Sequence, residues 1–415
     1  MTQKLAIQGS SESAIETIYP IQTLGTGDMD GENSVRDIPA GGLFSKLSQH
    51  AVCSFTVEFW DDRKYQFGGP GTPEFCLRIV NKRGLDELRS LDELRICEAY
   101  MLGDLDFEGD MLKLLDLKRA VPVWHPFFTF MKRLLQPKLF TQVGSDKKAI
   151  GAHYDYDDDF YTLFLDETRA YSQGVFESDD EALETAMRRK LDFAIASCQL
   201  QPGMRVLDLG GGWGSFTEYA GQRGIEVTSI TISEQSYRYI SRLIDQKNLP
   251  CQVIKQHFFE HLPEKKYDAV VILGVMEHLP DYRRVIRHVQ RVLRLGGRVY
   301  LDASADTEKF NAAFSPFITR HIFPGNHWAL SIHDLIAEVQ TSNLELIGVH
   351  NDRHSYYLTM KGWAENLEAA KTEIIDRWGR ELYCKFHLYL WGACHNLLTN
   401  EMQAYRVVLD HNPAR

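Results

Sequence analysis

The sequence predicts an α/β fold whose larger domain holds a doubly wound, mostly parallel sheet, preceded by a smaller α+β domain. From about residue 200 onward, short apolar runs alternate with segments whose apolar residues recur at helical spacing. The first of these runs, Arg205–Leu209, leads into glycines at every second position, namely Gly210, Gly212 and Gly214. Glycine lets the backbone turn sharply and come close to a ligand. In an open sheet such a turn lies at the carboxyl edge, where cofactors bind.

The alternation predicts five strands with three helices between them. The strands cover Arg205–Leu209, Glu226–Ile232, Cys251–Lys255, Asp268–Leu273 and Arg298–Ala303. The helices cover Ser215–Gln222, Ser236–Gln246 and Arg283–Leu293. A further helix is expected over Glu181–Cys198, ahead of the first strand. Ser178 and Glu181 match the capping-box pattern at its start.

The N-terminal part divides into an arm and a small domain. Residues 1–40 are rich in glycine, serine and acidic residues with little periodicity, so we expect a flexible arm. Within 41–117, apolar residues alternate from Cys53 to Phe67 around Asp61-Asp62-Arg63, which predicts a hairpin. Cys76–Val80 is expected to continue its sheet, and Leu85–Leu117 to form short helices. These elements together predict a small α+β domain.

The segment 118–150 is basic and aromatic. Its core, from Lys118 to Lys148, holds seven Lys or Arg residues and one acidic residue, Asp146, interleaved with Trp, Phe and Leu. This composition suits a segment that lies on an anionic membrane surface. It equally suits an interdomain linker helix whose aromatic side chains belong to the core. Both interpretations stay open.

Composition narrows the class of protein. A chain of 415 residues can form two domains, and its hydrophobic (44%) and charged (25%) fractions are ordinary for a soluble enzyme. No apolar run approaches the roughly 20 residues of a transmembrane helix, and the N-terminus lacks a secretory signal. The net charge of −11 argues against nucleic acid as the main partner. The seven cysteines are scattered, which favours free thiols in a reducing cytoplasm and indicates no metal site.

Acidic residues follow two neighbouring strands of the predicted sheet. Glu277 comes a few residues after the fourth strand, and Asp302 lies near the end of the fifth. Because the ends of parallel strands share one edge, both are expected beside the glycine turn. Two carboxylates placed close together titrate as a coupled pair with one pKa raised. Such a group is a candidate general base.

Several longer motifs resemble the cyclopropane fatty acid synthase family, which includes the mycolic acid cyclopropane synthases. The motifs are HYDYDDDFYTLFLDE from His153, AYSQGVF from Ala170, VLDLGGGWGSF from Val206, VTSITIS from Val227, VMEHLPD from Val275, RHIFPG from Arg320 and AYRVVL from Ala404. Two tracts, FWDDRKYQFGGPGTPEFCLRI and EAYMLGDLDFEGDMLKLL, are similar to the family's smaller N-terminal lipid-associated domain. The resemblance implies a Rossmann-like class I methyltransferase domain over 151–415 that depends on S-adenosylmethionine (SAM).

The resemblance also implies an activity. The family transfers a methyl group from SAM to the cis double bond of an acyl chain in a membrane phospholipid, giving a cyclopropane or a methylated alkene. An enzyme of this kind is expected in the cytoplasm, attached peripherally to the inner face of the membrane, with a homodimer as one assembly to consider. The residues implied to bind SAM are Tyr171, Ser172, Asp208, Gly210, Gly212, Gly214, Thr231, Ser236 and Phe258. Ser236 stands where the family has glutamine, and His257 where it has an acidic residue.

The sequence departs from the family at the proton acceptor. Relatives bind a bicarbonate ion as base through a cysteine, a glutamate, a histidine, an isoleucine and a tyrosine. Glu277 and Tyr356 are retained, whereas Gln173, Asp302 and Ser304 replace the cysteine, histidine and isoleucine. A carboxylate beside Glu277 would repel an anion by about 4 kcal/mol at about 4 Å and an effective dielectric of about 20. Bicarbonate is therefore doubtful, and Asp302, coupled to Glu277, is the expected proton acceptor.

Three aromatic residues, Tyr171, Phe176 and Tyr356, are candidates to stabilise a carbocation on the acyl chain by cation–π attraction. Two other functions compete with methylation of a lipid. One is methylation of a soluble amine or natural product, as in related plant enzymes. The other is lipid binding without catalysis, in a protein that retains a SAM pocket. The basic aromatic segment favours a lipid substrate over a soluble one.

Overall fold

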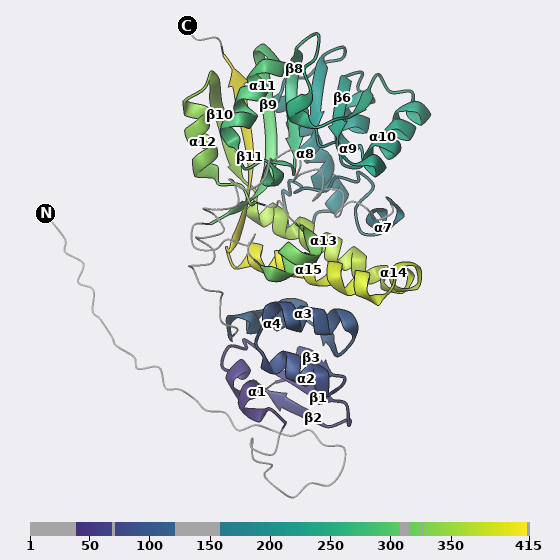
Figure 1. The fold of residues 1–415 in the computed structure, drawn as a ribbon, viewed down its shortest axis with the longest axis vertical. Helices are drawn as coiled ribbons and strands as arrows, with labels where there is room; N and C mark the ends of the chain where they lie inside the picture. Colours follow the sequence, from purple (N-terminus) through teal and green to yellow (C-terminus); the bar gives the residue numbers. More distant parts are fainter. Residues whose placement is uncertain (1–38, 69–70, 121–157, 308–314, 325–327, 413–415) are drawn as a thin grey trace, which may run out of the picture.

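The computed structural model describes residues 39–68, 71–120, 158–307, 315–324 and 328–412. The expected arm (1–40) lies almost wholly outside these residues, as does the basic aromatic segment beyond Ala120. The described chain forms a small N-terminal unit, a layer of long helices and a large α/β unit, stacked in that order in Figure 1.

The small unit contains a four-stranded sheet of order β2-β1-β3-β4. The predicted hairpin is confirmed as β1 (Phe55–Phe59) and β2 (Lys64–Phe67), which pair antiparallel. β3 (Phe75–Ile79) pairs parallel to β1. Within the stretch predicted as helical, Leu105–Gly109 instead forms β4, antiparallel to β3. The helices are α1 (Gly41–Ser48), α2 (Lys82–Arg89), α3 (Glu93–Leu102) and α4 (Met111–Asp116), with a 3-10 turn at Leu117–Ala120.

The large unit contains a seven-stranded sheet of order β10-β11-β9-β8-β5-β6-β7. The five predicted strands are all present and mutually parallel: β5 (Arg205–Leu209), β6 (Glu226–Thr231), β7 (Gln252–Lys255), β8 (Tyr267–Leu273) and β9 (Leu293–Asp306). Two strands that were not predicted from the sequence, β10 (Leu344–Asn351) and β11 (Met402–His411), extend the sheet antiparallel beyond β9.

Five helices accompany this sheet (Figure 1). They are α8 (Leu183–Ser197), α9 (Ser215–Gly221), α10 (Glu234–Lys247), α11 (Tyr282–Val292) and α12 (Ile332–Gln340). The capping box predicted for α8 is wrong. Ala182 precedes the helix without a side-chain cap, and Glu181 binds Arg189 through both carboxylate oxygens at 2.5 and 2.6 Å. Glu181 Oε2 also accepts from the backbone N–H of Glu177 at 3.0 Å, so this side chain joins the segment before the helix to a guanidinium within it.

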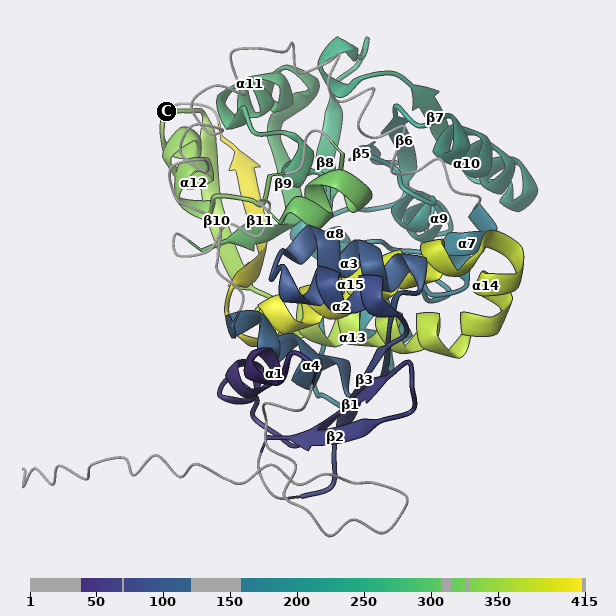
Figure 2. The same cartoon turned by 60° about the horizontal axis from the view of Figure 1, so that its bottom comes forward.

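Long helices separate the two sheets (Figures 1 and 2). They are α13 (Arg353–Ala369), α14 (Lys371–Trp378) and α15 (Arg380–Leu398), with the short α7 (Asp158–Thr162) beside α14. α15 holds the small unit through Tyr100 Oη and His387 Nδ1, 3.1 Å apart, and through Arg380 and Asp106, 3.0 Å apart. One continuous cluster of buried apolar residues runs from the small sheet into these helices. The small unit is therefore packed on the helical layer.

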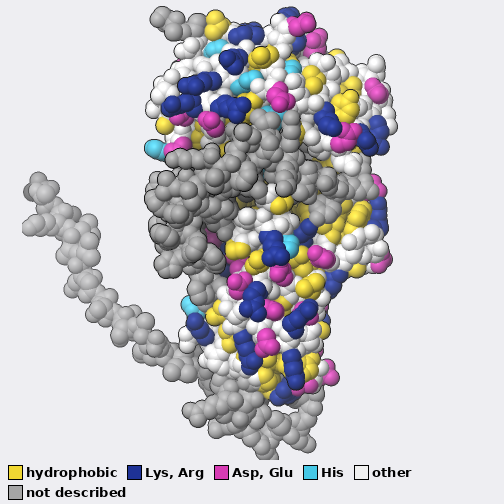
Figure 3. Space-filling view, viewed as in Figure 1, with side chains coloured by type: hydrophobic (Ala, Val, Ile, Leu, Met, Phe, Trp, Pro, Cys, Tyr) yellow, Lys and Arg dark blue, Asp and Glu magenta, His cyan; other side chains and the backbone are white. Residues whose placement is uncertain are grey.

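Charges of both signs are interspersed over the small unit on the face seen in Figure 3. Several form surface ion pairs, such as Arg78 with Glu58 at 3.1 Å and Arg95 with Glu87 at 2.5 Å. Among the described helices, none combines the length and apolar character needed to cross a membrane.

Candidate active site at the carboxyl edge of the sheet

The glycine turn after β5 has a backbone that other residues adopt only with strain. Gly210 has φ of 98° and Gly212 has φ of 51°. A Cβ at Gly210 would lie 2.3 Å from Cγ2 of Val275, so the turn packs tightly against the segment after β8. A Cβ at Gly212 would meet no atom within 4 Å. Gly210 is thus required for packing, whereas Gly212 faces open space.

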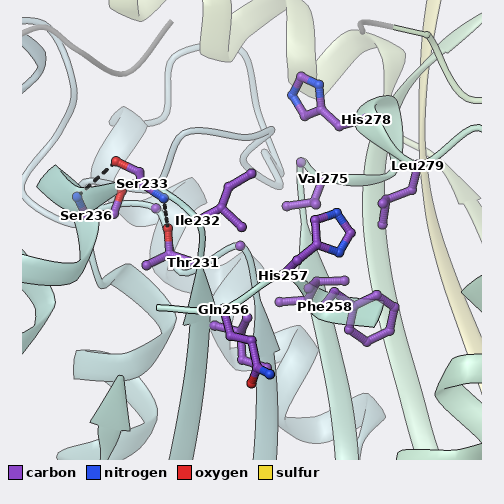
Figure 4. A pocket seen from close by; sticks show the side chains of 15 residues that line it. Thr231, Ile232, Ser233, Ser236, Gln256, His257, Phe258, Val275, His278 and Leu279 are labelled. Carbon is purple, nitrogen blue, oxygen red and sulfur yellow. Dashed lines mark hydrogen bonds between the residues drawn. The ribbon is translucent and has the colours of Figure 1, made fainter. Parts of the chain in front are cut away.

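That open space is a pocket at the carboxyl ends of β5 to β8, shown in Figure 4. Its empty volume, including the part open to solvent, is about 660 Å³. Five of the residues predicted to bind the cofactor line it, together with Ser233, Gln256, His257, Val275 and His278. The five are Gly210, Gly212, Thr231, Ser236 and Phe258. Segments far apart in sequence therefore meet at one cavity, as expected for a doubly wound sheet.

The start of α10 forms one wall of the pocket through a short hydrogen-bond chain. Thr231 Oγ1 accepts a hydrogen bond from the backbone N–H of Ser233 at 3.1 Å. Ser233 Oγ in turn accepts from the N–H of Ser236 at 3.2 Å and so caps the helix (Figure 4). The chain fixes Thr231 and Ser236 on this wall.

His257 and Phe258 form another wall. Nδ1 of His257 accepts a hydrogen bond from the backbone N–H of Phe259 at 3.2 Å. In a neutral ring, Nε2 is therefore the protonated nitrogen and a donor. Phe258 is buried and packs edge-on against His288, with ring centroids 4.5 Å apart.

Two predicted cofactor residues shape the turn without lining the pocket. Asp208 is buried, and its Oδ2 accepts hydrogen bonds from Thr217 Oγ1 and Ser229 Oγ, both at 3.1 Å. Burial raises the pKa of Asp208 to about 6. Gly214, with φ of 75°, is the residue that starts α9. Asp208 therefore ties β5 to β6 and α9.

Tyr171 and Ser172 lie behind the pocket wall. A Cβ on the pocket residue Gly274 would be 3.1 Å from Cβ of Ser172, so the two segments are in contact. Ser172 is buried. The ring of Tyr171 packs among aromatic neighbours, with centroids 5.6 Å from Tyr161 and 5.3 Å from Trp363.

The structure brings the two predicted acids to the end of β8. The backbone N–H of Gly274 donates to Asp302 Oδ1 at 2.9 Å. Glu277 lies on the short 3-10 turn Met276–His278, and its Oε1 accepts from Ser304 N at 2.7 Å and Ser304 Oγ at 2.9 Å. Both carboxyl groups are buried. Gly274 lines the pocket, so the acids lie directly behind its wall.

Burial governs the charge of these acids. Burial, assisted by nearby Asp302, raises the pKa of Glu277 to about 7 against the hydrogen bonds from Ser304. Burial likewise raises the pKa of Asp302 to about 6, although Lys190 and Ser172 lower it. Lys190 and Ser172 thus favour the charged form of Asp302, whereas Asp302 disfavours the charged form of Glu277.

Gln173 and Tyr356 are buried on other segments of the chain. Gln173 is fully buried, and its Nε2 donates to the carbonyl oxygen of Tyr405 on β11 at 3.2 Å. Tyr356 is buried in the first turn of α13, where its N–H donates to the Asp352 carbonyl oxygen at 2.7 Å. Phe176 is held by a hydrogen bond from its N–H to Ser355 Oγ at 3.1 Å.

These residues fit SAM better than they fit bicarbonate. Gly212 leaves room at the turn for a cofactor that a Cβ would obstruct. At the acid pair, Glu277 Oε2 and Gln173 Oε1 are buried and have no hydrogen-bond partner among the described residues. Gln173 Oε1 is an acceptor, and Asp302 adds a carboxylate. An anion placed beside Asp302 would be repelled by its charge once that acid ionises.

Sequence reasoning missed Lys190. It lies on α8, is fully buried, and its Nζ donates to Ser172 Oγ at 2.9 Å. A signal was present, because Lys190 is four residues after Ala186 and four before Ala194 on the apolar face of the helix. A second missed feature is the buried ion pair of Arg406 and Asp352, with N–O distances of 2.5 and 2.9 Å.

Comparison with known proteins finds two family matches. A family described as mycolic acid cyclopropane synthetase matches residues 141–407. A domain of unknown function (DUF7884) matches residues 43–120.

Individual relatives are similar over the methyltransferase-like region. Cyclopropane mycolic acid synthase 3 of Mycobacterium tuberculosis is 30% identical over 260 residues, which cover 59% of this chain and 90% of that protein. Sphingolipid C9-methyltransferase of Candida albicans is 26% identical over 319 residues, covering 71% and 61%. The structure of mycolic acid cyclopropane synthase CmaA1 complexed with SAH (S-adenosylhomocysteine) and CTAB aligns with a TM-score of 0.59 and 26% identity, over 63% of this chain and 97% of that one.

Proposed function

Because the chain belongs to the mycolic acid cyclopropane synthetase family, a family of SAM-dependent methyltransferases, we propose that it methylates the cis double bond of an unsaturated acyl chain. The acyl chain belongs to a membrane phospholipid, and the product is a cyclopropane or a methylated alkene. The proposed proton acceptor is Asp302, assisted by Glu277.

One observation carries this proposal: two buried carboxyl groups lie behind the wall of the glycine-turn pocket. Gly274 connects the two features, because it lines the pocket and donates its N–H to Asp302. A methyltransferase that acts on oxygen or nitrogen releases an acidic proton. Methylation of an alkene leaves a carbocation, whose C–H proton must be removed by a positioned base. Buried acids beside the cofactor pocket supply such a base.

When bound, SAM supplies an electrophilic methyl group. An alkene is a poor nucleophile, so the protein must align the two reactants and exclude water. After methyl transfer, the positive charge on the acyl chain is stabilised by aromatic faces, for which Tyr171, Phe176 and Tyr356 are proposed. Asp302 then takes a proton. Loss of that proton from the new methyl group closes a cyclopropane, and loss from a neighbouring carbon leaves a methylated alkene.

The charge of the site supports direct proton transfer to the protein rather than to bicarbonate. Asp302 and Ser304 replace the family's histidine and isoleucine. The hydroxyl of Ser304 donates to Glu277 Oε1, a contact that isoleucine cannot make. Both acids are buried, and one oxygen of each has no hydrogen-bond partner among the described residues. Repulsion between like charges makes an anion unfavourable there.

Features outside the catalytic pair support a lipid substrate. The named relatives act on mycolic acids and sphingolipids, and the segment 118–150 is basic and aromatic. Co-sedimentation with liposomes containing anionic phospholipid separates this proposal from methylation of a soluble amine. We expect the full chain to sediment with such liposomes, and to remain in solution with zwitterionic ones at high salt.

Mass spectrometry of fatty acids from a bacterial host that expresses the chain tests the reaction itself. We expect acyl chains heavier by one methylene group, carrying the label when the methyl group of SAM is isotopically labelled. Retained unsaturation indicates a methylated alkene, and lost unsaturation indicates a cyclopropane. Unchanged acyl chains in a host that makes the folded protein would contradict the proposal.

A further inference from the structure

Lys190 is a fully buried lysine behind the pocket wall, and its Nζ contacts Ser172. It occupies the apolar face of α8, between Ala186 and Ala194, where an uncharged side chain would be expected. Burying an ammonium group is costly unless it is paired and hydrogen-bonded. A lysine at this position therefore needs a specific partner.

The contacts of Lys190 lead to Asp302. Its Nζ lies 2.9 Å from Ser172 Oγ and 3.5 Å from the Ser172 carbonyl oxygen. Ser172 packs against Gly274, and the N–H of Gly274 donates to Asp302 Oδ1. Ser172 and Lys190 both favour the charged form of Asp302. Lys190, Ser172, Gly274 and Asp302 thus form one connected set.

Three carboxylates attract Lys190, and Asp302 does so most strongly. Burial lowers the pKa of Lys190, whereas Asp302, Asp166 and Asp352 raise it. Asp166 accepts hydrogen bonds from the N–H and hydroxyl of Thr168, at 3.1 and 2.9 Å. Asp352 is engaged by Arg406 through two hydrogen bonds. Asp302 forms no ion pair with any described residue within 4.0 Å, so the field of Lys190 is its nearest cationic support.

Glu277 lacks comparable support. Its hydrogen bonds come from neutral Ser304 and its own backbone, and nearby Asp302 disfavours its ionisation. The charged and titratable groups that face Asp302 come from five places in the fold: Lys190 on α8, Glu277 after β8, Tyr300 on β9, Asp352 before α13 and Arg406 on β11. Among them, Lys190 is the cation without a dedicated carboxylate.

We propose that Lys190 is a positioning residue for proton transfer: with the Ser172 hydroxyl that it holds, it keeps Asp302 charged while Glu277 remains the neutral member of the pair. The proposal rests on the function proposed above. In this arrangement one buried lysine makes two similar carboxyl groups differ: Asp302 accepts the proton, and Glu277 stays neutral. Lys190 itself does not contact the reacting atoms.

The first test compares the pH dependence of kcat in wild type, K190M, K190R and the surface control K361M. In K190M the acidic limb of the kcat profile should move up by at least about one pH unit, because an opposite charge nearby shifts a carboxyl pKa by that order. At about pH 5, well below the pKa, kcat should therefore fall about tenfold, and the difference from wild type should vanish at alkaline pH. K190R should retain most of the rate, and K361M, which removes an exposed pair with Glu365, should behave as wild type.

The same variants separate positioning from a structural role. In a D302N background, adding K190M should change the residual rate less than about twofold, because the group it acts on is gone. Binding of SAH and the urea midpoint verify that each variant is folded. An unmoved kcat profile in K190M, or a loss confined to KM for SAM, would overturn the proposal.

An infrared titration keeps this test independent of the methyl-transfer reaction. The C=O band of a protonated carboxyl group, assigned to Asp302 by its absence in D302N, should grow as the pH falls through about 6 in wild type. In K190M the same band should appear at higher pH. If the band shifts and no acyl chain is methylated, the proposed substrate is wrong and the role of Lys190 stands. If acyl chains are methylated and the band does not move, the role of Lys190 is wrong.

Discussion

Glu277 Oε1 accepts hydrogen bonds from both the backbone N–H and the hydroxyl of Ser304, at 2.7 and 2.9 Å. Ser304 lies two residues after Asp302 on β9, so one strand carries an acid and also the donor that holds the other acid. The contact turns Glu277 toward β9 and leaves its Oε2 buried without a partner among the described residues. The geometry of the acid pair therefore depends on Ser304.

The substitution Glu277→Gln should stabilise the protein increasingly as the pH rises. The folded state holds a proton on Glu277 up to about pH 7, whereas the unfolded chain releases it near 4.5. Folding therefore binds a proton between these values, and stability from this group falls as pH rises through the window. Relative to wild type, E277Q should gain about 2 to 3 kcal/mol between about pH 5 and about pH 8. Urea unfolding of both proteins at these two pH values measures the gain. A difference in unfolding free energy that is the same at both pH values would contradict the raised pKa of Glu277.

The rate of methyl transfer should rise with pH through about 6 and then level off. Asp302 accepts a proton only when ionised, and its pKa is raised to about 6 by burial. The profile of kcat in bicarbonate-free buffer, at saturating SAM, measures this limb. A rate that declines steadily from about pH 5 to about pH 8 would be incompatible with a carboxylate acceptor of this kind.

The substitution Gly212→Ala should weaken cofactor binding specifically. The Cβ of the new alanine would enter the open pocket. The control Gly203→Ala also adds a Cβ that meets no atom within 4 Å, but Gly203 does not line the pocket. Both positions have positive φ, 51° and 82°, so both variants should lose about 1 kcal/mol of stability. Calorimetry with SAH should show at least about a tenfold weaker Kd for G212A alone, equivalent to about 1.4 kcal/mol. Equal affinities in the two variants would place the cofactor elsewhere.

The five parallel strands could be predicted because local pattern and tertiary environment agree. Each is a short apolar run between turn residues, and all but the edge strand β7 lie within the sheet with mostly buried side chains. β10 and β11 were missed because their place is decided by long-range pairing. β11 lies beside β9, about a hundred residues earlier in the chain, with Arg406 opposite Asp302. Nothing local to Met402–His411 indicates that partner.

In the candidate site, the sequence predicted where residues lie along the sheet edge but not how their side chains are oriented. The sequence placed Glu277 and Asp302 at one edge because topology alone brings strand ends together. The orientation of Asp208 was not predicted. Successive side chains of a strand alternate between its two faces, and Asp208 turns toward Thr217 and Ser229 instead of lining the pocket. Lys190 was missed because lysine is usually exposed, and its burial is decided by acids that come from other elements.

The most direct test of the account is the response of methyl transfer to bicarbonate in wild type and D302A. In buffer depleted of carbon dioxide, wild type should methylate unsaturated phospholipid at its full rate, and added bicarbonate should not increase it. D302A should bind SAH normally and lose activity by at least about a hundredfold, the contribution typical of a general base. Normal activity in D302A that still depends on added bicarbonate would contradict the claim that this protein uses its own carboxylate.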